Sequence, residues 1–500
     1  MKRHTGLGHI RRIHFIGIGG ISMSGLAEIL SKDGFTVSGS DWTSKDTTDH
    51  LQNIGIDISI GRGDASIITP DIDLVVYTAA VKPDNPELMA AKALGIPTMV
   101  RAELLGVMLQ GYEHAVCVAG SHGKTSTTAL ITSIAVAAGL DPTVNIGGHI
   151  AGTSISAEAN SLVPQQDNEP APVSKDTNYL VGDSSYFILE SCEYSNSYHH
   201  FHPYIGIILN IDADHMEFHG TMDALIDSFA KFARNIRPGG TLIIQENIPG
   251  FERIVSGLSC NVITFCTSKT RDDSLAHEQN RAPSPAQQYW IRDATQNADG
   301  SSSFDIMTGS LFMARVKLPL PGKYNMYNAL AAFIVGIELG IEAHAISKAL
   351  YQAQNVRRRY EYKGEINGIT IIDDYAHHPT AIKACLKATR EAYPGKRLIC
   401  LFQPHTYTRT RNHFDDFAMA FGDADITLFA PIYAAREPFD PTISSAMLAQ
   451  KVKENGHASI NCNNLDEAEA WLRGKLMPHD LLITMGAGDA HLVGERLLAK

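Results

Sequence analysis

Short apolar runs alternate with amphipathic stretches along the N-terminal part of the chain. Residues 13–18, 36–38 and 74–77 have the length and composition of buried strands. Residues 23–30 and 86–94 have the spacing of helices. Strands that alternate with helices form βαβ units, in which neighbouring strands are parallel. The pattern therefore predicts an open, mostly parallel α/β sheet.

The same rhythm restarts twice further along the chain. The apolar run at 115–119 leads through a glycine-rich turn into a helix of small residues at 125–138. Later strands are expected at residues 187–189, 205–211, 369–372, 398–402, 426–429 and 481–485. Three such units in a chain of this length predict three α/β domains. The expected domains are residues 1–112, 113–354 and 355–500.

Composition narrows the class of protein. The 500 residues are 44% hydrophobic and 19% charged, which is typical of a globular chain and not of a disordered one. Lys and Arg number 42 against 54 Asp and Glu, giving a net charge of −12. This balance argues against a general affinity for nucleic acid or anionic lipid. We therefore expect no nucleic-acid partner, and any anionic ligand needs a local site.

Cysteine usage and apolar run lengths bear on the compartment. The seven cysteines form no C-x-x-C pair, which favours a reducing environment, and we expect the cytoplasm. The basic N-terminus followed by residues 13–30 resembles a signal peptide, but glycines and Glu28 interrupt this run. No apolar stretch has the length of a membrane span, so we expect no membrane insertion.

Two segments lack the regular pattern. Residues 156–178 have turn and linker composition, which predicts an exposed loop. Residues 267–303 are mainly polar around Tyr289 and Trp290, which predicts short strands and a hairpin at the edge of the second domain. We assign no function to either segment.

The strongest local signal lies between the strand at 115–119 and the following helix. It consists of Gly120, Ser121, His122, Gly123, Lys124, Thr125 and Ser126. Backbone N–H groups at such a turn face phosphates, while Lys124 adds positive charge and Thr125 can hold Mg²⁺. Val118 stands where the standard phosphate-loop pattern has its first glycine. The alternative is an ordinary glycine-rich turn with an exposed lysine.

Another glycine turn, the first along the chain, follows the first strand. It consists of Gly17, Ile18, Gly19 and Gly20, and the second strand ends at Ser40 and Asp41. Such a turn lets the backbone approach a diphosphate and leaves an acidic side chain near a ribose or base. The turn predicts a nucleotide or dinucleotide site. Close packing of a helix on the sheet, without a ligand, is the alternative.

Two further clusters follow predicted strand ends. Glu190 to Glu193 and Asn210 to His215 offer carboxylate and imidazole groups beside the phosphate loop, a donor set that suits Mg²⁺ or Mn²⁺. The third unit carries Asp373, Asp374, Tyr375, His377, His378, Gln403, His405 and Arg409. Acids, imidazoles and a guanidinium at one sheet edge predict a site for a small zwitterion.

Taken in order, these motifs resemble the Mur ligases, the ATP-dependent amide-forming enzymes of peptidoglycan precursor synthesis. The resemblance spans nearly the whole chain and also includes Pro321, Gly322, Asn325, Asn328 and the segment 486–489. It implies a Rossmann-like N-terminal domain, a phosphate-loop ATPase-like central domain and a Rossmann-like C-terminal domain. It favours the alanine-adding branch, whose substrates are ATP, UDP-N-acetylmuramate and L-alanine, with Mg²⁺ as cofactor and Mn²⁺ as a substitute.

The resemblance also implies residue roles. Gly17 to Gly20 with Ser40 and Asp41 would bind the UDP part of the nucleotide sugar. Lys124 would hold the ATP phosphates, and Thr125, Glu193 and His215 would bind metal. Asn325 and Asn328 fall on the adenine side, and Tyr375, His377 and Arg409 fall on the amino-acid side. Lys124, Glu193, His215 and His377 are the candidate catalytic residues.

Several positions depart from the family pattern. Tyr324 replaces a histidine before the adenine-side asparagine, and Thr406 replaces an arginine near Arg409. Phe229 stands where other Mur ligases have a carbamylated lysine, which fits the alanine-adding branch. Cys192 replaces the aspartate before the catalytic glutamate.

Three other functions stay open on the sequence alone. A ligase that adds a preformed peptide to the same nucleotide sugar would differ mainly in the amine pocket. An NAD-dependent oxidoreductase would explain the first glycine turn but would leave Lys124, Glu193 and His215 without a role. A non-catalytic nucleotide-binding regulator would not need these groups either. The sequence leaves the oligomeric state open.

Overall fold

The computed structural model describes residues 5–78, 81–150, 177–266, 287–297, 299–353, 356–435 and 437–499. The chain forms two compact units. The first comprises Met1–Trp290, Met307–Leu311 and Leu330–Ala349, and the second comprises Ile291–Ile306, Phe312–Ala329 and Leu350–Lys500. Among the described residues, no helix has both the length and the apolar character needed to cross a membrane.

The N-terminal sheet has five described strands in the order β3-β2-β1-β4-β5, all parallel. The strands are β1 (Arg12–Ile16), β2 (Thr36–Asp41), β3 (Asp57–Ile60), β4 (Leu74–Tyr77) and β5 (Thr98–Val100). The helices are α1 (Ile21–Lys32), α2 (Asp46–Asn53), α3 (Pro86–Ala93) and α4 (Arg101–Leu109), with 3-10 turns η1 (Thr5–Leu7) and η2 (Ala65–Ile67). Ile16 pairs with Ser40 and Tyr77, so the segments after β1, β2 and β4 start at one edge.

Gly39 lies in β2 under the first glycine turn. A Cβ there would be 2.6 Å from Ile18 Cδ1 and 2.8 Å from Phe15 O. We expect Gly39→Ala to lower the free energy of unfolding by about 1–3 kcal/mol, because these groups must shift to admit a methyl group. Chemical denaturation measures the change. Gly395→Ala is the control, since a Cβ at Gly395 has nothing within 4 Å; equal stability of the two variants would contradict the expectation.

The central sheet has ten described strands in the order β15-β14-β13-β12-β11-β10-β6-β9-β7-β8. The strands are β6 (His114–Ala119), β7 (Thr143–Ile150), β8 (Thr177–Leu180), β9 (Tyr186–Glu190), β10 (Ile205–Ile208), β11 (Thr241–Gln245), β12 (Asn261–Cys266), β13 (Gln287–Gln296), β14 (Ser302–Thr308) and β15 (Leu311–Leu318). The helices are α5 (Lys124–Ala137), α6 (Met216–His219), α7 (Met222–Arg234), α8 (Phe251–Val255), α10 (Lys323–Glu338) and α11 (Ala343–Gln352), with the 3-10 segment η3 (Tyr194–His200).

The centre of this sheet positions the phosphate loop. β10, β6 and β9 are parallel neighbours, with Ile208 opposite Ala119 and Val118 opposite Glu190. Their carboxyl ends therefore lie side by side, and the segments that follow them start at one edge of the sheet.

The C-terminal sheet has six described strands in the order β16-β17-β21-β18-β19-β20, and only the β16–β17 pair among them is antiparallel. The strands are β16 (Glu361–Ile366), β17 (Ile369–Asp374), β18 (Leu398–Phe402), β19 (Ile426–Phe429), β20 (Ser459–Asn461) and β21 (Leu481–Met485). The helices are α12 (Pro379–Ala392), α13 (Tyr407–Asn412), α14 (Phe414–Ala418), α15 (Ser445–Glu454), α16 (Leu465–Lys475) and α17 (His491–Leu498).

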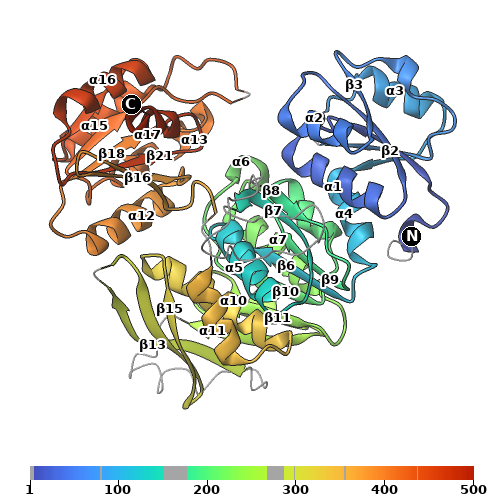
Figure 1. Ribbon diagram of the computed structural model, residues 1–500, viewed down its shortest axis with the longest axis horizontal. Helices are drawn as coiled ribbons and strands as arrows, with labels where there is room; N and C mark the ends of the chain where they lie inside the picture. The colour runs from blue at the N-terminus through green and yellow to red at the C-terminus, as the bar shows by residue number, and fades with distance from the viewer. Residues whose placement is uncertain are drawn as a thin grey trace, which may run out of the picture. The chain divides into compact units, whose positions relative to one another are not determined.

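Helices cover both faces of the C-terminal sheet (Figure 1). Cys400 and Phe402 pack in a core that includes residues of α12, α14 and α15. Ile399 and Leu401, which point to the opposite face of the same strand, pack in a core that includes residues of α16 and α17. Because both faces are buried, β18 is apolar throughout instead of alternating.

The predicted α/β class is confirmed, and the three predicted α/β units correspond to three sheets. The strand expected at 205–211 is shorter, because β10 ends at Ile208 and a polar segment follows. The hairpin region contains the long strands β13 and β14, although residues 267–286 and 298 lie outside the described residues. Of the loop expected at 156–178, residues 156–176 lie outside them too, and 177–178 begin β8.

Candidate active site

The loop between β6 and α5 has the backbone geometry of a phosphate site. Gly120 and Gly123 have φ of +139° and +84°, a region that favours glycine. α5 begins at Lys124, continues through Thr125 and the half-buried Ser126, and has no acidic residue in its first turn. Its N–H groups and the positive end of its dipole therefore favour an anion at this loop.

The segment after β10 braces this loop. The His122 N–H donates to Asn210 Oδ1 at 2.8 Å, and Asn210 Nδ2 donates to the His122 carbonyl at 2.9 Å. Ser121 Oγ donates to the Asp212 carbonyl at 3.1 Å, and His122 Nε2 lies 3.0 Å from Asp212 Oδ2. The side chains of Ser121 and His122 thus help to fix the loop.

Lys124 forms a buried ion pair with Glu193. Its Nζ lies 2.8 Å from Glu193 Oε2 and 3.1 Å from Oε1, and it also donates to the carbonyl oxygen of Gly120 at 2.6 Å. Burial by itself lowers the pKa of an ammonium group, but the Glu193 carboxylate raises the pKa of Lys124 above its ordinary value. Lys124 is therefore a fixed cation at the start of α5.

Glu193, Asp214 and His215 form a cluster that fits a divalent cation. One ligand atom from each lies within 4.8 Å of the others, and Glu193 and Asp214 are buried. His215 has φ of +54°, an uncommon value for a residue other than glycine, and its N–H donates to Asp214 Oδ1 at 2.9 Å. Two carboxylates and an imidazole suit Mg²⁺ or Mn²⁺ whose remaining positions are completed by phosphate oxygens.

Asp214 was not singled out among the expected ligands, although it precedes His215 in the acidic motif. Thr125, which was expected with them, has a different partner in the structure. Its hydroxyl donates to Glu190 Oε1 at 3.0 Å, and Glu190 Oε2 accepts the Gly147 N–H at 2.7 Å. Burial raises the pKa of the adjacent Cys192 thiol to about 11, so Cys192 adds no charge at neutral pH.

The first glycine turn lies at the edge of the N-terminal sheet. The N–H groups of Gly17 and Ile18 donate to the Ser40 carbonyl at 2.8 and 2.9 Å, and the Gly19 N–H donates to Asp41 Oδ2 at 3.0 Å. Gly20 is the N-cap of α1. The four residues of the turn therefore lie next to Ser40 and Asp41 at the end of β2.

The hydroxyl of Ser40 points into the protein. It donates to Glu87 Oε2 at 2.6 Å, and His14 Nε2 lies 3.2 Å from the same oxygen. All three side chains are buried. A ligand at the turn would therefore meet the backbone near Ser40, because its hydroxyl is bonded to Glu87.

Asn325 and Asn328 lie in the first half of α10, within the second compact unit. Asn325 Nδ2 donates to the Pro321 carbonyl at 2.8 Å, and both asparagines are buried. Burial raises the pKa of the neighbouring Tyr324, which therefore stays a neutral phenol.

The residues expected to bind the amino-acid substrate form a connected group in the second compact unit. His377 Nδ1 lies 2.8 Å from the Tyr375 carbonyl, and the His377 ring centroid lies 5.8 Å from that of His405. Arg409 Nη1 lies 3.2 Å from His405 Nδ1. His405 therefore links His377 to Arg409, a connection that the order of residues along the chain did not reveal.

The pKa of His405 is lowered, first by burial and second by Arg409. Because the folded-state pKa lies below the unfolded value of about 6.5, the unfolded chain binds more protons in acid. The contribution of a neutral His405 to stability is thus present above that value and lost as the pH falls through the folded pKa. We expect the stability of the second unit to decline less from about pH 7 to about pH 5 in His405→Asn than in wild type. Chemical denaturation across this range measures the difference, and equal declines would contradict the assignment.

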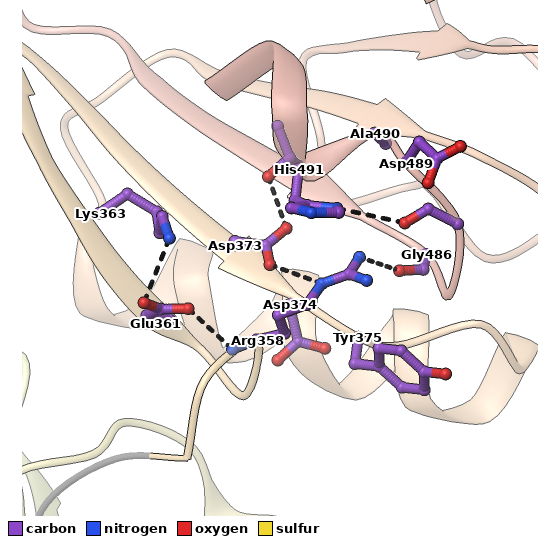
Figure 2. A network of polar contacts seen from close by, with 12 residues as sticks. Arg358, Glu361, Lys363, Asp373, Asp374, Tyr375, Gly486, Asp489, Ala490 and His491 are labelled. Atoms are coloured by element: carbon purple, nitrogen blue, oxygen red, sulfur yellow. Dashed lines mark hydrogen bonds and ion pairs between the residues drawn. The ribbon is translucent and has the colours of Figure 1, made fainter. Parts of the chain in front are cut away.

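Figure 2 shows Arg358 at the centre of a polar network in the same unit. Its Nε donates to Asp373 Oδ2 at 3.0 Å, its Nη2 to the Gly486 carbonyl at 2.6 Å and its N–H to Glu361 Oε2 at 2.8 Å. Its guanidinium lies 5.1 Å from the Tyr375 ring centroid. Burial raises the pKa of Asp373 despite Arg358. Arg358 was not among the residues expected from the sequence, although its place in a run of three arginines ahead of Asp373 was a signal.

Comparison with known proteins gives the family. The model of the Mur ligase family catalytic domain matches residues 12–113, that of the Mur ligase middle domain matches 118–336, and that of the Mur ligase glutamate ligase domain matches 358–488. The chain is 41% identical over 491 residues to the UDP-N-acetylmuramate–L-alanine ligase of Clostridium novyi, covering 98% of this chain and 97% of that protein. It is 43% identical over 488 residues to the ligase of the same name from Agathobacter rectalis, with 98% of each covered. The chain belongs to the Mur ligase family and is an ATP-dependent ligase.

Solved structures agree on the fold. The UDP-N-acetylmuramate–alanine ligase of Thermotoga maritima matches with a TM-score of 0.75 at 24% identity, over 98% of this chain and 99% of that one. A murein peptide ligase from Psychrobacter arcticus matches with a TM-score of 0.63 at 23% identity, over 98% of each chain. The three-domain Mur ligase fold predicted from the sequence is confirmed.

Proposed function

We propose that the protein joins L-alanine to the lactyl carboxylate of UDP-N-acetylmuramate with cleavage of ATP, forming UDP-N-acetylmuramoyl-L-alanine for peptidoglycan synthesis. The observation that carries the chemistry is the buried Lys124–Glu193 pair beside the phosphate loop and the Asp214–His215 cluster. Similarity over nearly the full chain to ligases of this name supports the choice of substrates.

The reaction needs an activated carboxylate, because a carboxylate oxygen is a poor leaving group. A lactyl carboxylate oxygen attacks the γ-phosphorus of ATP, and the bond from that phosphorus to the β-γ bridging oxygen breaks to release ADP. The alanine nitrogen then attacks the carbonyl carbon of the acyl phosphate, and the carbon–oxygen bond to phosphate breaks. Phosphate leaves, and the two protons lost from the alanine ammonium pass to acceptors at the site or in solvent.

The first step is mainly a problem of charge. Lys124 would neutralise charge on the transferred phosphoryl oxygens, and the segment from Gly120 to Ser126 would hold the phosphates, with the N–H groups at the start of α5 as donors. Glu193, Asp214 and His215 would hold Mg²⁺ or Mn²⁺, which supplies further neutralisation of phosphate charge. Thr125 would contribute to this site through its hydrogen bond to Glu190, or as a metal ligand once ATP is bound.

The remaining groups bind the other parts of the substrates. We assign the UDP part to the turn from Gly17 to Gly20 and the backbone near Asp41, and adenine to the region of Asn325 and Asn328. We assign L-alanine to Tyr375, His377 and Arg409, where Arg409 faces the carboxylate and His377 orients or deprotonates the amine. The proposed domains are residues 1–112, 113–354 and 355–500, and the proposed compartment is the cytoplasm.

The test is phosphate release from ATP in the presence of UDP-N-acetylmuramate and Mg²⁺, with single amino acids or L-alanyl peptides as acceptors. L-Alanine should stimulate release and give a product heavier by one alanyl residue. Stimulation by peptides alone would move the protein to the peptide-adding activity. Absence of stimulation by either acceptor would overturn the proposal.

A further inference from the structure

Arg101 lies at the edge of the N-terminal sheet that carries the glycine turn. It was not among the site residues expected from the sequence. It is the first residue of α4, directly after β5, and β5 pairs in parallel with β4. Its Nη1 donates to Ser22 Oγ at 2.6 Å. Ser22 belongs to the first turn of α1, which begins directly after the glycine turn. The guanidinium of Arg101 is therefore beside the glycine turn.

The charge of Arg101 has no carboxylate partner among the described residues, where the structure shows no ion pair for it. The nearest acid on its own helix, Glu103, accepts the Val100 N–H at 2.8 Å instead. Cys192, whose thiol is close enough to influence it electrostatically, offers no carboxylate. The Arg101 side chain is partly buried, and this burial lowers its pKa. A partly buried guanidinium whose partner is a neutral hydroxyl and not a carboxylate is costly, which points to an anion that arrives with a ligand.

Arg237, in the same compact unit, has the hydrogen-bond partners typical of an arginine with a structural role. Its guanidinium donates to three backbone carbonyls, those of His202, Tyr112 and Leu109, at 2.8, 2.9 and 2.7 Å. A guanidinium has five N–H donors. Within the part of the chain that the structure describes, Arg101 uses one of them, on Ser22, which leaves the others available to a ligand.

We propose that Arg101 binds the diphosphate of the nucleotide sugar at the glycine turn. This inference rests on the proposed function and adds a residue to its UDP-sugar site. The N–H groups of Met23 and Ser24 in the first turn of α1 donate to the Gly20 carbonyl. No acidic side chain occupies this turn, and the N–H groups of Ile21 and Ser22 lie ahead of the first bond within the helix. A diphosphate there accepts bonds from these N–H groups and from the fork of Arg101, which matches phosphate geometry.

The substrate carries a second anion, the lactyl carboxylate, which Arg101 could meet instead. UDP-N-acetylglucosamine has the same diphosphate but no lactyl group, so it separates the two. We expect Arg101→Met to weaken binding of both UDP-N-acetylmuramate and UDP-N-acetylglucosamine by at least about 30-fold in calorimetric titrations. Arg101→Lys should lose less, because the ammonium keeps the charge but not the fork. KM for ATP and for L-alanine should not change.

Arg237→Met is the matched control. It should lower thermal stability and leave both nucleotide-sugar affinities as in wild type, and the melting temperature of each Arg101 variant shows that it is folded. If Arg101→Met does not fold, the affinity of Arg101→Lys decides. Loss of affinity for UDP-N-acetylmuramate alone would assign Arg101 to the lactyl carboxylate and overturn the proposal. Unchanged affinity for both nucleotide sugars would overturn it as well.

The inference and the proposed function can fail separately. If wild-type protein binds UDP-N-acetylglucosamine in an Arg101-dependent manner but releases no phosphate with L-alanine or a peptide, the ligase proposal fails and the role of Arg101 stands. If L-alanine stimulates phosphate release and the Arg101 variants keep wild-type affinities, the role of Arg101 fails alone.

Discussion

Replacing Lys124 by methionine is expected to lower kcat for L-alanine-dependent phosphate release by about 10²- to 10³-fold. Lys124 is the cation at the start of α5, 2.8 Å from Glu193 Oε2. Methionine fills a similar volume without the charge, so the transferred phosphoryl group loses its stabilisation in the transition state. Steady-state kinetics at saturating substrates measure this change.

The same substitution has a cost to stability. It leaves Glu193, which is 1% exposed, without its cation, and breaking a buried pair from one side costs about 3–5 kcal/mol. The double variant Lys124→Met with Glu193→Gln should recover much of that stability without recovering activity. Lys231→Met, at an exposed position of α7, should leave both quantities unchanged. Activity of Lys124→Met near the wild-type value would remove Lys124 from the phosphoryl site.

Replacing Asp214 by asparagine is expected to raise the Mg²⁺ concentration for half-maximal activity by about 10- to 100-fold. Asp214 is buried and shares a 4.8 Å cluster of ligand atoms with Glu193 and His215. The amide keeps the size and one oxygen but loses the negative charge that attracts a divalent cation. Titration of activity with Mg²⁺, and of the protein alone with Mn²⁺ observed by electron paramagnetic resonance, gives the two readouts.

Asp223→Asn is the control for this experiment. Asp223 is an exposed acid that pairs with Arg253 at 3.2 Å, so its removal should not alter the metal dependence. A wild-type Mn²⁺ affinity in Asp214→Asn would show that the cluster is not the metal site. A lower affinity for Mn²⁺ together with unchanged kcat at high Mg²⁺ would separate metal binding from transition-state stabilisation.

Only part of the candidate site could be predicted from the sequence. The phosphate loop could be predicted because Gly120, Gly123 and Lys124 lie within one short segment, so the motif is visible without knowledge of distant contacts. The pairing of Lys124 with Glu193 joins residues far apart in sequence, and it depends on β6 and β9 being neighbours. The bond from Thr125 to Glu190 has the same origin, which is why the expected metal set differs from the cluster that the structure brings together.

The burial and the partners of charged side chains were the features least predictable from the sequence. Arg101 and Arg237 are both arginines in an α/β segment, and only their contacts distinguish a guanidinium with three carbonyl partners from one bonded to a single hydroxyl. Ser40 was expected to bind the UDP part of the nucleotide sugar, but its hydroxyl is bonded to Glu87.

The sequence by itself determined the α/β class, the order of most strands along the chain and the glycine turns, because each follows from hydrophobic periodicity or from backbone freedom at single residues. The tertiary structure alone decided strand order within each sheet, and with it which strand ends are neighbours. It also decided which charges are buried and paired. These properties depend on contacts between distant segments, and the free energy of a buried charge is set by the groups around it and not by its neighbours in sequence.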